Sequence, residues 1–181
     1  MFKLEKHEAK ITHVSIRREK HGKEGKLGID ISLAIQTANI TLDMLQQGLK
    51  EALFRKASKG EQLDAFEGSE GLVALKFPQL EPLKLESEYT GYETELTGFL
   101  DASSTTLLVD VKLKDFTINP IEGGSVKITL KAQLQAQPDE LSEVVDWWMN
   151  EAIRLTLTPP TAQVGDGPAA NDDNGAEGAA A

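Results

Sequence analysis

The side chains that could do chemistry in this sequence are mainly cationic, and they gather early in the chain. The stretch IRREKHGKEGK, residues 16–26, belongs to a chain of 181 residues with a formal net charge of −10. Cationic side chains at this density bind phosphate groups, so the stretch is a candidate nucleic-acid contact. Lysines at the end of a hairpin also keep that end soluble, and this second explanation stays open. The candidate cations of the stretch are Arg17, Arg18, Lys20, Lys23 and Lys26.

The charge of the whole chain is distributed unevenly. Residues 1–60 hold 12 Lys or Arg against 7 Asp or Glu, whereas the remaining residues hold 7 Lys or Arg against 22 Asp or Glu. The first part therefore carries a net charge of +5 and the rest carries −15. Such asymmetry indicates either a basic contact surface balanced by acidic regions or ordinary solvated faces.

A second group of lysines lies in residues 105–135, where two alternating segments flank the turn sequence NPIEGG. Pairing the two arms places Lys112 opposite Lys131. Directly opposed like charges destabilise a sheet, and an anion lying across the face would relieve that cost. Asp110 and Asp115 support the other interpretation, a mixed and solvated outer face. The candidate cations of this hairpin are Lys112, Lys114, Lys127 and Lys131.

Single-stranded nucleic acid also needs aromatic rings on which its bases can stack. Tyr89 and Tyr92 flank a short turn in the sequence EYTGYE, and we expect both rings to be partly exposed. Trp147 lies off the main apolar stripe of its expected helix and is a further candidate for an exposed ring. We assign three other aromatic side chains to the core, namely Phe77, Phe116 and Trp148.

The sequence contains no recognisable catalytic or metal-binding pattern. It has no cysteine, which excludes thiol nucleophiles, thiolate zinc sites and disulfides. His7, His13 and His21 are six and eight residues apart, which differs from the short spacing of zinc ligands. No H-E-x-x-H, G-x-S-x-G or phosphate-loop pattern occurs. We therefore expect no enzymatic activity, no cofactor and no metal.

Alternating side chains predict that β-hairpins carry the cations. Residues 26–36 alternate apolar with polar or small side chains, which is typical of a half-buried strand. Residues 10–18 are the predicted partner strand, with Gly22 and Gly25 in the turn. In the second hairpin the apolar pattern changes phase near Asp115, which predicts a β-bulge there. The side chains expected to face inward are Leu27, Ile29, Ile31, Leu33 and Ile35 in the first hairpin, and Leu107, Val109, Val111, Leu113, Phe116, Ile118, Val126, Ile128, Leu130, Ala132 and Leu134 in the second.

Two helices are also predicted. Leucines spaced by three and four positions predict a helix over residues 41–56. Residues 138–152 predict a second helix, because Pro138 suits its first turn. The expected buried stripe of this second helix is Leu141, Val145, Trp148 and Ala152. Further strands are predicted over residues 72–78, 83–87, 91–98 and 153–158.

These elements favour a β-dominated (α+β) fold, an antiparallel sandwich or barrel of about eight strands with two helices. Residues 1–160 form the predicted globular domain. Residues 161–181 contain four acids, no base and only one Val as a larger apolar residue, so we predict a disordered acidic tail. The chain has no apolar run of membrane-spanning length and no secretory signal pattern, so we expect a cytoplasmic protein.

Four segments carry a resemblance to known proteins, namely AKITHVSIRREKHGKEGKLGIDISL, LKFPQLEPLKLESEYTGYETEL, DFTINPIEGGSVKITLKAQLQ and IRLTLTPP. They resemble a group of small tailed-phage and prophage proteins, which often accompany recombination or replication genes. The resemblance covers about residues 1–160 and implies a bacterial cytoplasm as the location. A β-rich body with an acidic tail is also similar to phage and bacterial single-strand DNA-binding proteins, although this tail ends in GAEGAAA rather than in a hydrophobic tip.

The leading functional expectation is a non-enzymatic accessory protein of phage DNA metabolism that binds single-stranded DNA through its basic β-hairpins. One alternative is a phage protein-binding module that inhibits a host or defence protein. A second alternative is a phage structural or assembly protein. The expected partner is thus single-stranded DNA or a host or phage protein, without a membrane, and a homo-oligomer stays open.

Overall fold

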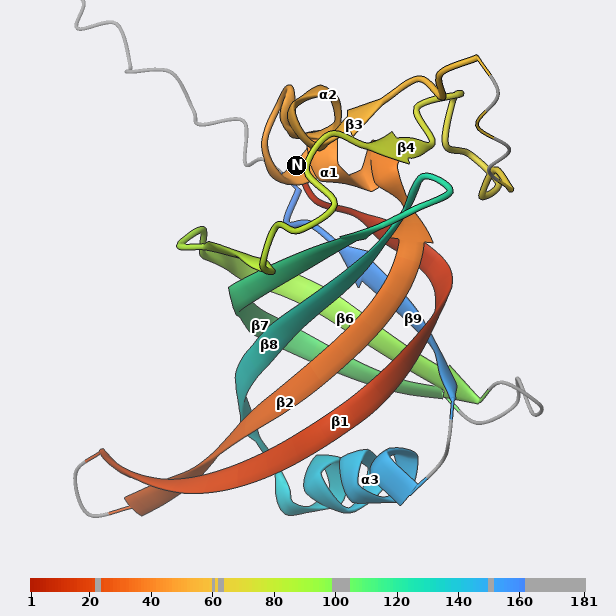
Figure 1. Cartoon of the computed structure of the whole chain (residues 1–181). Helices are drawn as coiled ribbons and strands as arrows, with labels where there is room; N and C mark the ends of the chain where they lie inside the picture. The colour runs from red at the N-terminus through yellow and green to blue at the C-terminus, as the bar shows by residue number, and fades with distance from the viewer. Residues whose placement is uncertain (22–23, 60, 62–63, 99–104, 150–151, 162–181) are drawn as a thin grey trace, which may run out of the picture.

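Six long antiparallel strands of this computed structural model close into a barrel (Figure 1). The order around the barrel is β7-β6-β9-β1-β2-β8, and β8 pairs again with β7. The structure describes residues 1–21, 24–59, 61, 64–98, 105–149 and 152–161. The barrel strands are β1 (Leu4–His21), β2 (Glu24–Ala38), β6 (Tyr89–Gly98), β7 (Thr105–Ile121), β8 (Ser125–Ala136) and β9 (Ile153–Thr158). The expected β-dominated antiparallel fold is confirmed, and of the two architectures considered it is the barrel.

The barrel core follows from the alternation in the strands. In β2, Ile29, Ile31, Leu33 and Ile35 are all buried, and the expected inward side chains of β8 are buried opposite them. Each of these four residues of β2 faces an apolar residue of β8, as Ile31 faces Ala132. These cross-strand pairs remove both apolar rows from water, which is the main energetic reason for the pairing. The predicted first hairpin is therefore confirmed over its described residues, except that Gly25 lies within β2 and pairs with Lys20 instead of lying in the turn.

Strand β7 contains two β-bulges, of which the sequence pattern predicted one. The bulge at Asp115 is confirmed by a φ of 55° and by a register shift between Lys114 and Thr117. A second bulge lies at Asp110, where φ is 53°. Because each extra residue reverses the alternation, Leu107 and Val109 point outward, with 53% and 52% of their surface exposed. The expectation that these two side chains face the core is wrong.

One end of the barrel is capped by residues 39–82 instead of by a single helix (Figure 1). The helix predicted over residues 41–56 is interrupted, because Gly48 has a left-handed φ of 81° and the chain turns there. Two leucines on each side of the break still pack into the core. The elements are η1 (Asn39–Thr41), α1 (Leu42–Leu45), α2 (Leu49–Leu53), β3 (Phe54–Arg55) and β4 (Ala74–Leu75), where β3 and β4 form a two-stranded sheet. A further short strand, β5 (Leu83–Leu85), pairs with β7.

Helix α3 (Pro138–Met149) lies at the other end of the barrel (Figure 1). It begins at Pro138 as predicted, but its buried residues lie one position before the predicted Val145 and Trp148. Val144 and Trp147 are buried, whereas Trp148 is 39% exposed, so the expected places of the two tryptophans are exchanged. The Trp147 indole N–H donates to Thr106 Oγ1 at 2.8 Å, and this tertiary contact with β7 orients the helix. Helical periodicity contains no information about such a partner.

Two further expectations concern Phe77 and the acidic tail. Phe77, which we assigned to the core, is 60% exposed in the segment that follows β4. The acidic tail predicted for residues 161–181 lies outside the described residues, apart from Thr161.

Candidate functional site

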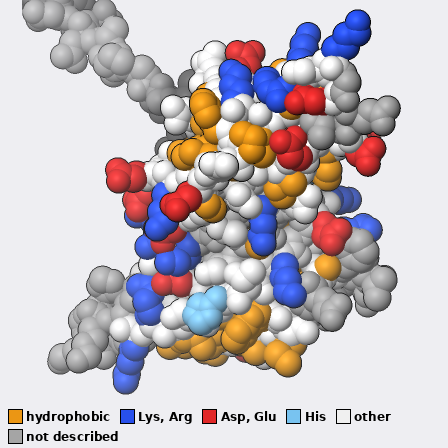
Figure 2. Space-filling model, in the orientation of Figure 1, with side chains coloured by type: hydrophobic (Ala, Val, Ile, Leu, Met, Phe, Trp, Pro, Cys, Tyr) orange, Lys and Arg blue, Asp and Glu red, His pale blue; other side chains and the backbone are white. Residues whose placement is uncertain are grey.

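The outward side of β9, β1, β2, β8 and β7 presents most of the cations of the barrel strands. We call this surface the basic face, and Figure 2 shows cationic side chains spread over it with polar side chains between them. Its acids include Glu8, Asp30, Asp110 and Asp115, with Glu88 at its edge. The alternation of buried and solvent-facing residues assigns seven cations to this face, namely Lys10, Arg17, Lys112, Lys114, Lys127, Lys131 and Arg154.

The strand register brings cations from distant parts of the sequence into adjacent rows. Ser32 of β2 pairs with Lys131 of β8, which pairs with Lys114 of β7. The sequence interpretation had placed Lys112 opposite Lys131, and this is wrong because Lys112 pairs with Gln133. The predicted pairing of the two strands is displaced by two residues from the observed pairing, because the bulge at Asp115 sets the register of this hairpin.

Carboxylates neutralise three of the cations. Lys131 Nζ lies 2.7 Å from Asp115 Oδ2, Lys112 Nζ lies 2.6 Å from Glu88 Oε2, and Arg17 forms a 3.0 Å pair with Asp30. The hydrogen bond from Lys131 lowers the pKa of Asp115, and the same bond raises the pKa of Lys131. The repulsion expected between opposed lysines is therefore relieved by acids of the chain itself at this point of the face.

Other cations of the basic face remain open to a ligand. Within the described part of the chain, Lys10, Lys114 and Lys127 have no carboxylate in ion-pair distance. Lys10 and Lys127 stand on either side of β2, in neighbouring rows of the sheet. Cations without a partner are the ones that gain most from a bound phosphate, because they replace only water and counterions.

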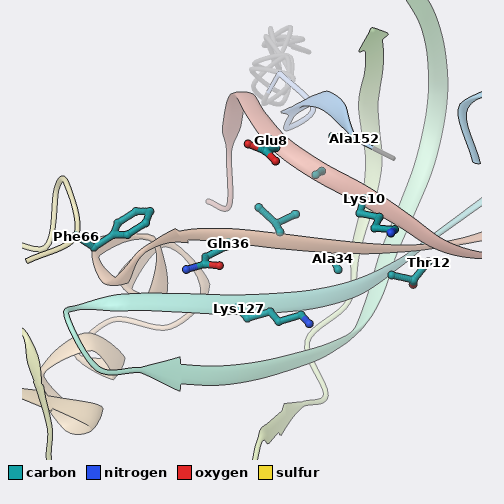
Figure 3. Close-up of a pocket in the computed structure, with 10 residues that line it drawn as sticks. Glu8, Lys10, Thr12, Ala34, Gln36, Phe66, Lys127 and Ala152 are labelled. Carbon is teal, nitrogen blue, oxygen red and sulfur yellow. The ribbon is translucent and has the colours of Figure 1, made fainter. Parts of the chain in front are cut away.

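A groove of about 550 Å³ lies on the basic face between these two lysines (Figure 3). Ala34 of β2 also lines the groove, and its small side chain fills little of that space. Glu8, Lys10 and Thr12 of β1 form one side, and Gln36 of β2 and Lys127 of β8 form the other (Figure 3). The aromatic ring of Phe66 projects toward the groove from the cap.

Of the aromatic residues singled out from the sequence, Tyr92 and Trp147 are buried, whereas Tyr89 stays partly exposed as expected. Tyr92 is buried, and its hydroxyl donates to the Phe2 carbonyl oxygen at 2.8 Å. Burial raises the pKa of Tyr92 to about 12. Tyr89 is half-buried, and its ring packs edge-on against Phe116 at 5.6 Å. The expectation that Tyr92 and Trp147 offer exposed rings is wrong, because both rings fill space inside the barrel.

The exposed rings of this surface are Phe66 and Trp148. Phe66 is 38% exposed in a Gly- and acid-rich loop, where no periodic pattern could have indicated it. Trp148 of α3 contacts His13 of β1, with ring centroids 6.2 Å apart. The sequence did contain a signal for the exposure of Trp148. An apolar stripe that begins at Val144 instead of Val145 leads three residues on to Trp147 and leaves Trp148 outside the buried face.

The far end of the first hairpin contains the other predicted cations. Arg17 lies on the basic face, whereas the alternation places Arg18, which pairs with Leu27, on the opposite side of β1. The side chains of Lys20, Lys23 and Lys26 lie outside the described residues.

We compared the chain with protein-family models, with curated proteins and with solved structures, and found no match. The resemblance to phage proteins therefore stays a prediction. Within the described ranges, no group of three or more His, Cys, Asp or Glu side chains could hold a metal ion. None of the described helices has both the length and the apolar character needed to cross a membrane.

Proposed function

We propose that this protein is a non-enzymatic accessory of phage DNA metabolism that binds single-stranded DNA along its basic face. The observation that carries the proposal is the concentration of charge. The face holds 7 of the 19 Lys and Arg residues of the chain, whereas 4 of its 29 Asp and Glu residues, namely Glu8, Asp30, Asp110 and Asp115, lie among them. A chain of net charge −10 repels a polyanion over most of its surface, so a basic face defines where DNA can approach.

Binding along this face begins with phosphate contacts. Lys10, Lys114 and Lys127 are cations of the basic face that have no carboxylate in ion-pair distance within the described part of the chain, and they lie on three different strands. A DNA backbone that crosses the strands of the sheet can reach all three. Each contact releases condensed counterions from the DNA, which makes the affinity depend on salt.

A protein partner is the second candidate, because an apolar group is also exposed. Ile16, Trp148 and Met149 are exposed, and Figure 2 shows apolar side chains at the end of the molecule where α3 lies. Apolar contact areas of this kind occur in protein interfaces, and their binding depends weakly on salt. The dependence of affinity on salt therefore distinguishes the two candidates.

The test measures binding of a fluorescent oligothymidine to the full chain by anisotropy at several salt concentrations. We expect the logarithm of the affinity to fall linearly with the logarithm of the salt concentration. Lys114→Gln and Lys127→Gln should each reduce this slope by about 0.7, the value for one phosphate contact to a single strand. Lys56→Gln is the matched control, because Lys56 is an exposed lysine of the cap.

The control variant should bind like the wild-type protein. An affinity that does not change with salt, or slopes that stay equal in all four proteins, would contradict the proposal. A separate experiment tests the phage context: the protein is crosslinked to DNA in infected cells, and the DNA bound to it is recovered and identified.

A further inference from the structure

Two exposed aromatic rings lie at the basic face, and their positions indicate contacts with bases in addition to the phosphate contacts. Phe66 borders the groove beside Gln36 and Lys127, and Trp148 contacts His13 on the same face. Exposed aromatic rings next to unpaired cations are the combination that binds single strands, because the rings stack on bases while the cations contact phosphates.

The backbone of Phe66 is held firmly although its ring is exposed. Its N–H donates to the Gly123 carbonyl oxygen at 2.7 Å, and the Gly123 N–H donates to the Val73 carbonyl oxygen at 2.8 Å. The turn between β7 and β8 thus fixes the cap loop to the barrel. A ring on a fixed backbone loses little conformational entropy when a base stacks on it.

The residues that lie beside the two rings are separated by the length of a short run of nucleotides. Phe66 lines the groove together with Gln36, and His13, whose ring packs against Trp148, pairs with Ser32, four residues before Gln36 in β2. At about 3.3 Å per residue, four residues span about 13 Å, which is the length of about four stacked nucleotides. Lys10 and Thr12 lie between the two rings on β1.

We propose that Phe66 and Trp148 are base-stacking residues, and that the groove beside Phe66 receives an unpaired base whose flanking phosphates contact Lys10 and Lys127. This inference rests on the proposed DNA-binding function and adds the selection of single strands. In a duplex each base is already stacked and paired, so a duplex reaches only the cations of the face.

The experiment compares an oligothymidine with a duplex of the same length. We expect Phe66→Ala and Trp148→Ala each to weaken oligothymidine binding by about tenfold. Neither change should alter the salt slope, because no phosphate contact is lost, and duplex binding should stay the same. Phe66→Tyr should retain the affinity. Phe77→Ala is the control, because Phe77 is an exposed phenylalanine that does not line the groove.

Fluorescence supplies a second measurement. Trp148 is exposed and Trp147 is buried, so bound bases should quench the emission of Trp148, and Trp148→Phe should abolish that change while retaining most of the affinity. Wild-type affinity in both alanine variants, together with normal salt dependence, would overturn the stacking inference and leave the proposed function standing. Failure of the wild-type protein to bind oligothymidine at low salt would overturn both.

Discussion

Gly123 is the residue at which the cap and the barrel are joined. It has a φ of +91°, and a Cβ atom placed on it would lie 2.5 Å from the Asp64 carbonyl oxygen. Its N–H and carbonyl oxygen both take part in hydrogen bonds to the cap. A side chain here would therefore strain the backbone and also displace the loop that carries Phe66.

We expect Gly123→Ala to lower the free energy of unfolding by more than about 2 kcal/mol, because strain and a steric clash with backbone add together. Gly48→Ala is the matched control. Gly48 also has a positive φ, of +81°, but a Cβ atom placed on it would meet nothing within 4 Å, so only strain of about 1–2 kcal/mol remains. Urea unfolding of the three proteins measures the difference. Equal losses in the two variants would show that the clash at Gly123 has no energetic weight.

At the level of the element, strand β7 determines how the basic face is composed. The bulge at Asp115 places its carboxylate beside Lys131, and so an acid lies within the row of cations. The bulge at Asp110 turns Leu107 and Val109 outward on the first half of the same strand. One strand therefore contributes a basic half and an apolar half to the outer surface.

The carboxylate of Asp115 should weaken DNA binding, and Asp115→Asn tests this. Asn tolerates the left-handed φ of 55° found at this position, so the bulge should persist. Removing the negative charge releases Lys131 from its ion pair, and we expect the oligothymidine affinity to rise about threefold, because one more attraction to the DNA is gained. The control is Glu93→Gln, an equal charge change at an exposed residue of β6, which should alter the affinity less. A weaker affinity in Asp115→Asn, with unfolding unchanged, would argue against DNA on this part of the face.

At the scale of the whole molecule, cations and acids are unevenly distributed, although ion pairs join them on the basic face and in the cap. The basic face occupies one side of the barrel, whereas β6 exposes Glu93, and residues 161–181 of the sequence contain acids and no base. An acidic segment tethered to the same chain competes with DNA for a basic surface, at a high effective concentration. This competition is a consequence of the proposed function that requires no contact between specific residues.

Deletion of residues 161–181 should leave the midpoint of thermal unfolding essentially unchanged, because the segment has almost no large apolar side chain that could pack. The same deletion should tighten oligothymidine binding, most strongly at low salt where charges are least screened. A full-length variant with the four acids of the tail changed to amides is the control and should bind as the deletion does. A clear loss of thermal stability would show that the segment packs against the barrel.

Local patterns in the sequence were enough to predict the strands and much of their inward faces. Alternation in β2 and β8 is local information, because each side chain faces the opposite side from its neighbour whatever the strand pairs with. The bulge at Asp115 was predictable for the same reason, since it appears as a change of phase within a single strand. Five of the predicted DNA-contacting cations, Arg17, Lys112, Lys114, Lys127 and Lys131, accordingly lie on one outer face.

In contrast, tertiary contacts alone decided which residues from distant parts of the sequence lie next to one another in space. Lys10 and Arg154 joined the basic face because β1 lies between β9 and β2, and strand order depends on long-range pairing. Trp147 turned inward because Thr106, 41 residues away, accepts its indole hydrogen bond. Phe66 reached the groove because its loop is bonded to Gly123. Each of these outcomes depends on contacts between residues far apart in sequence, and such contacts leave no periodic trace in the segments that make them.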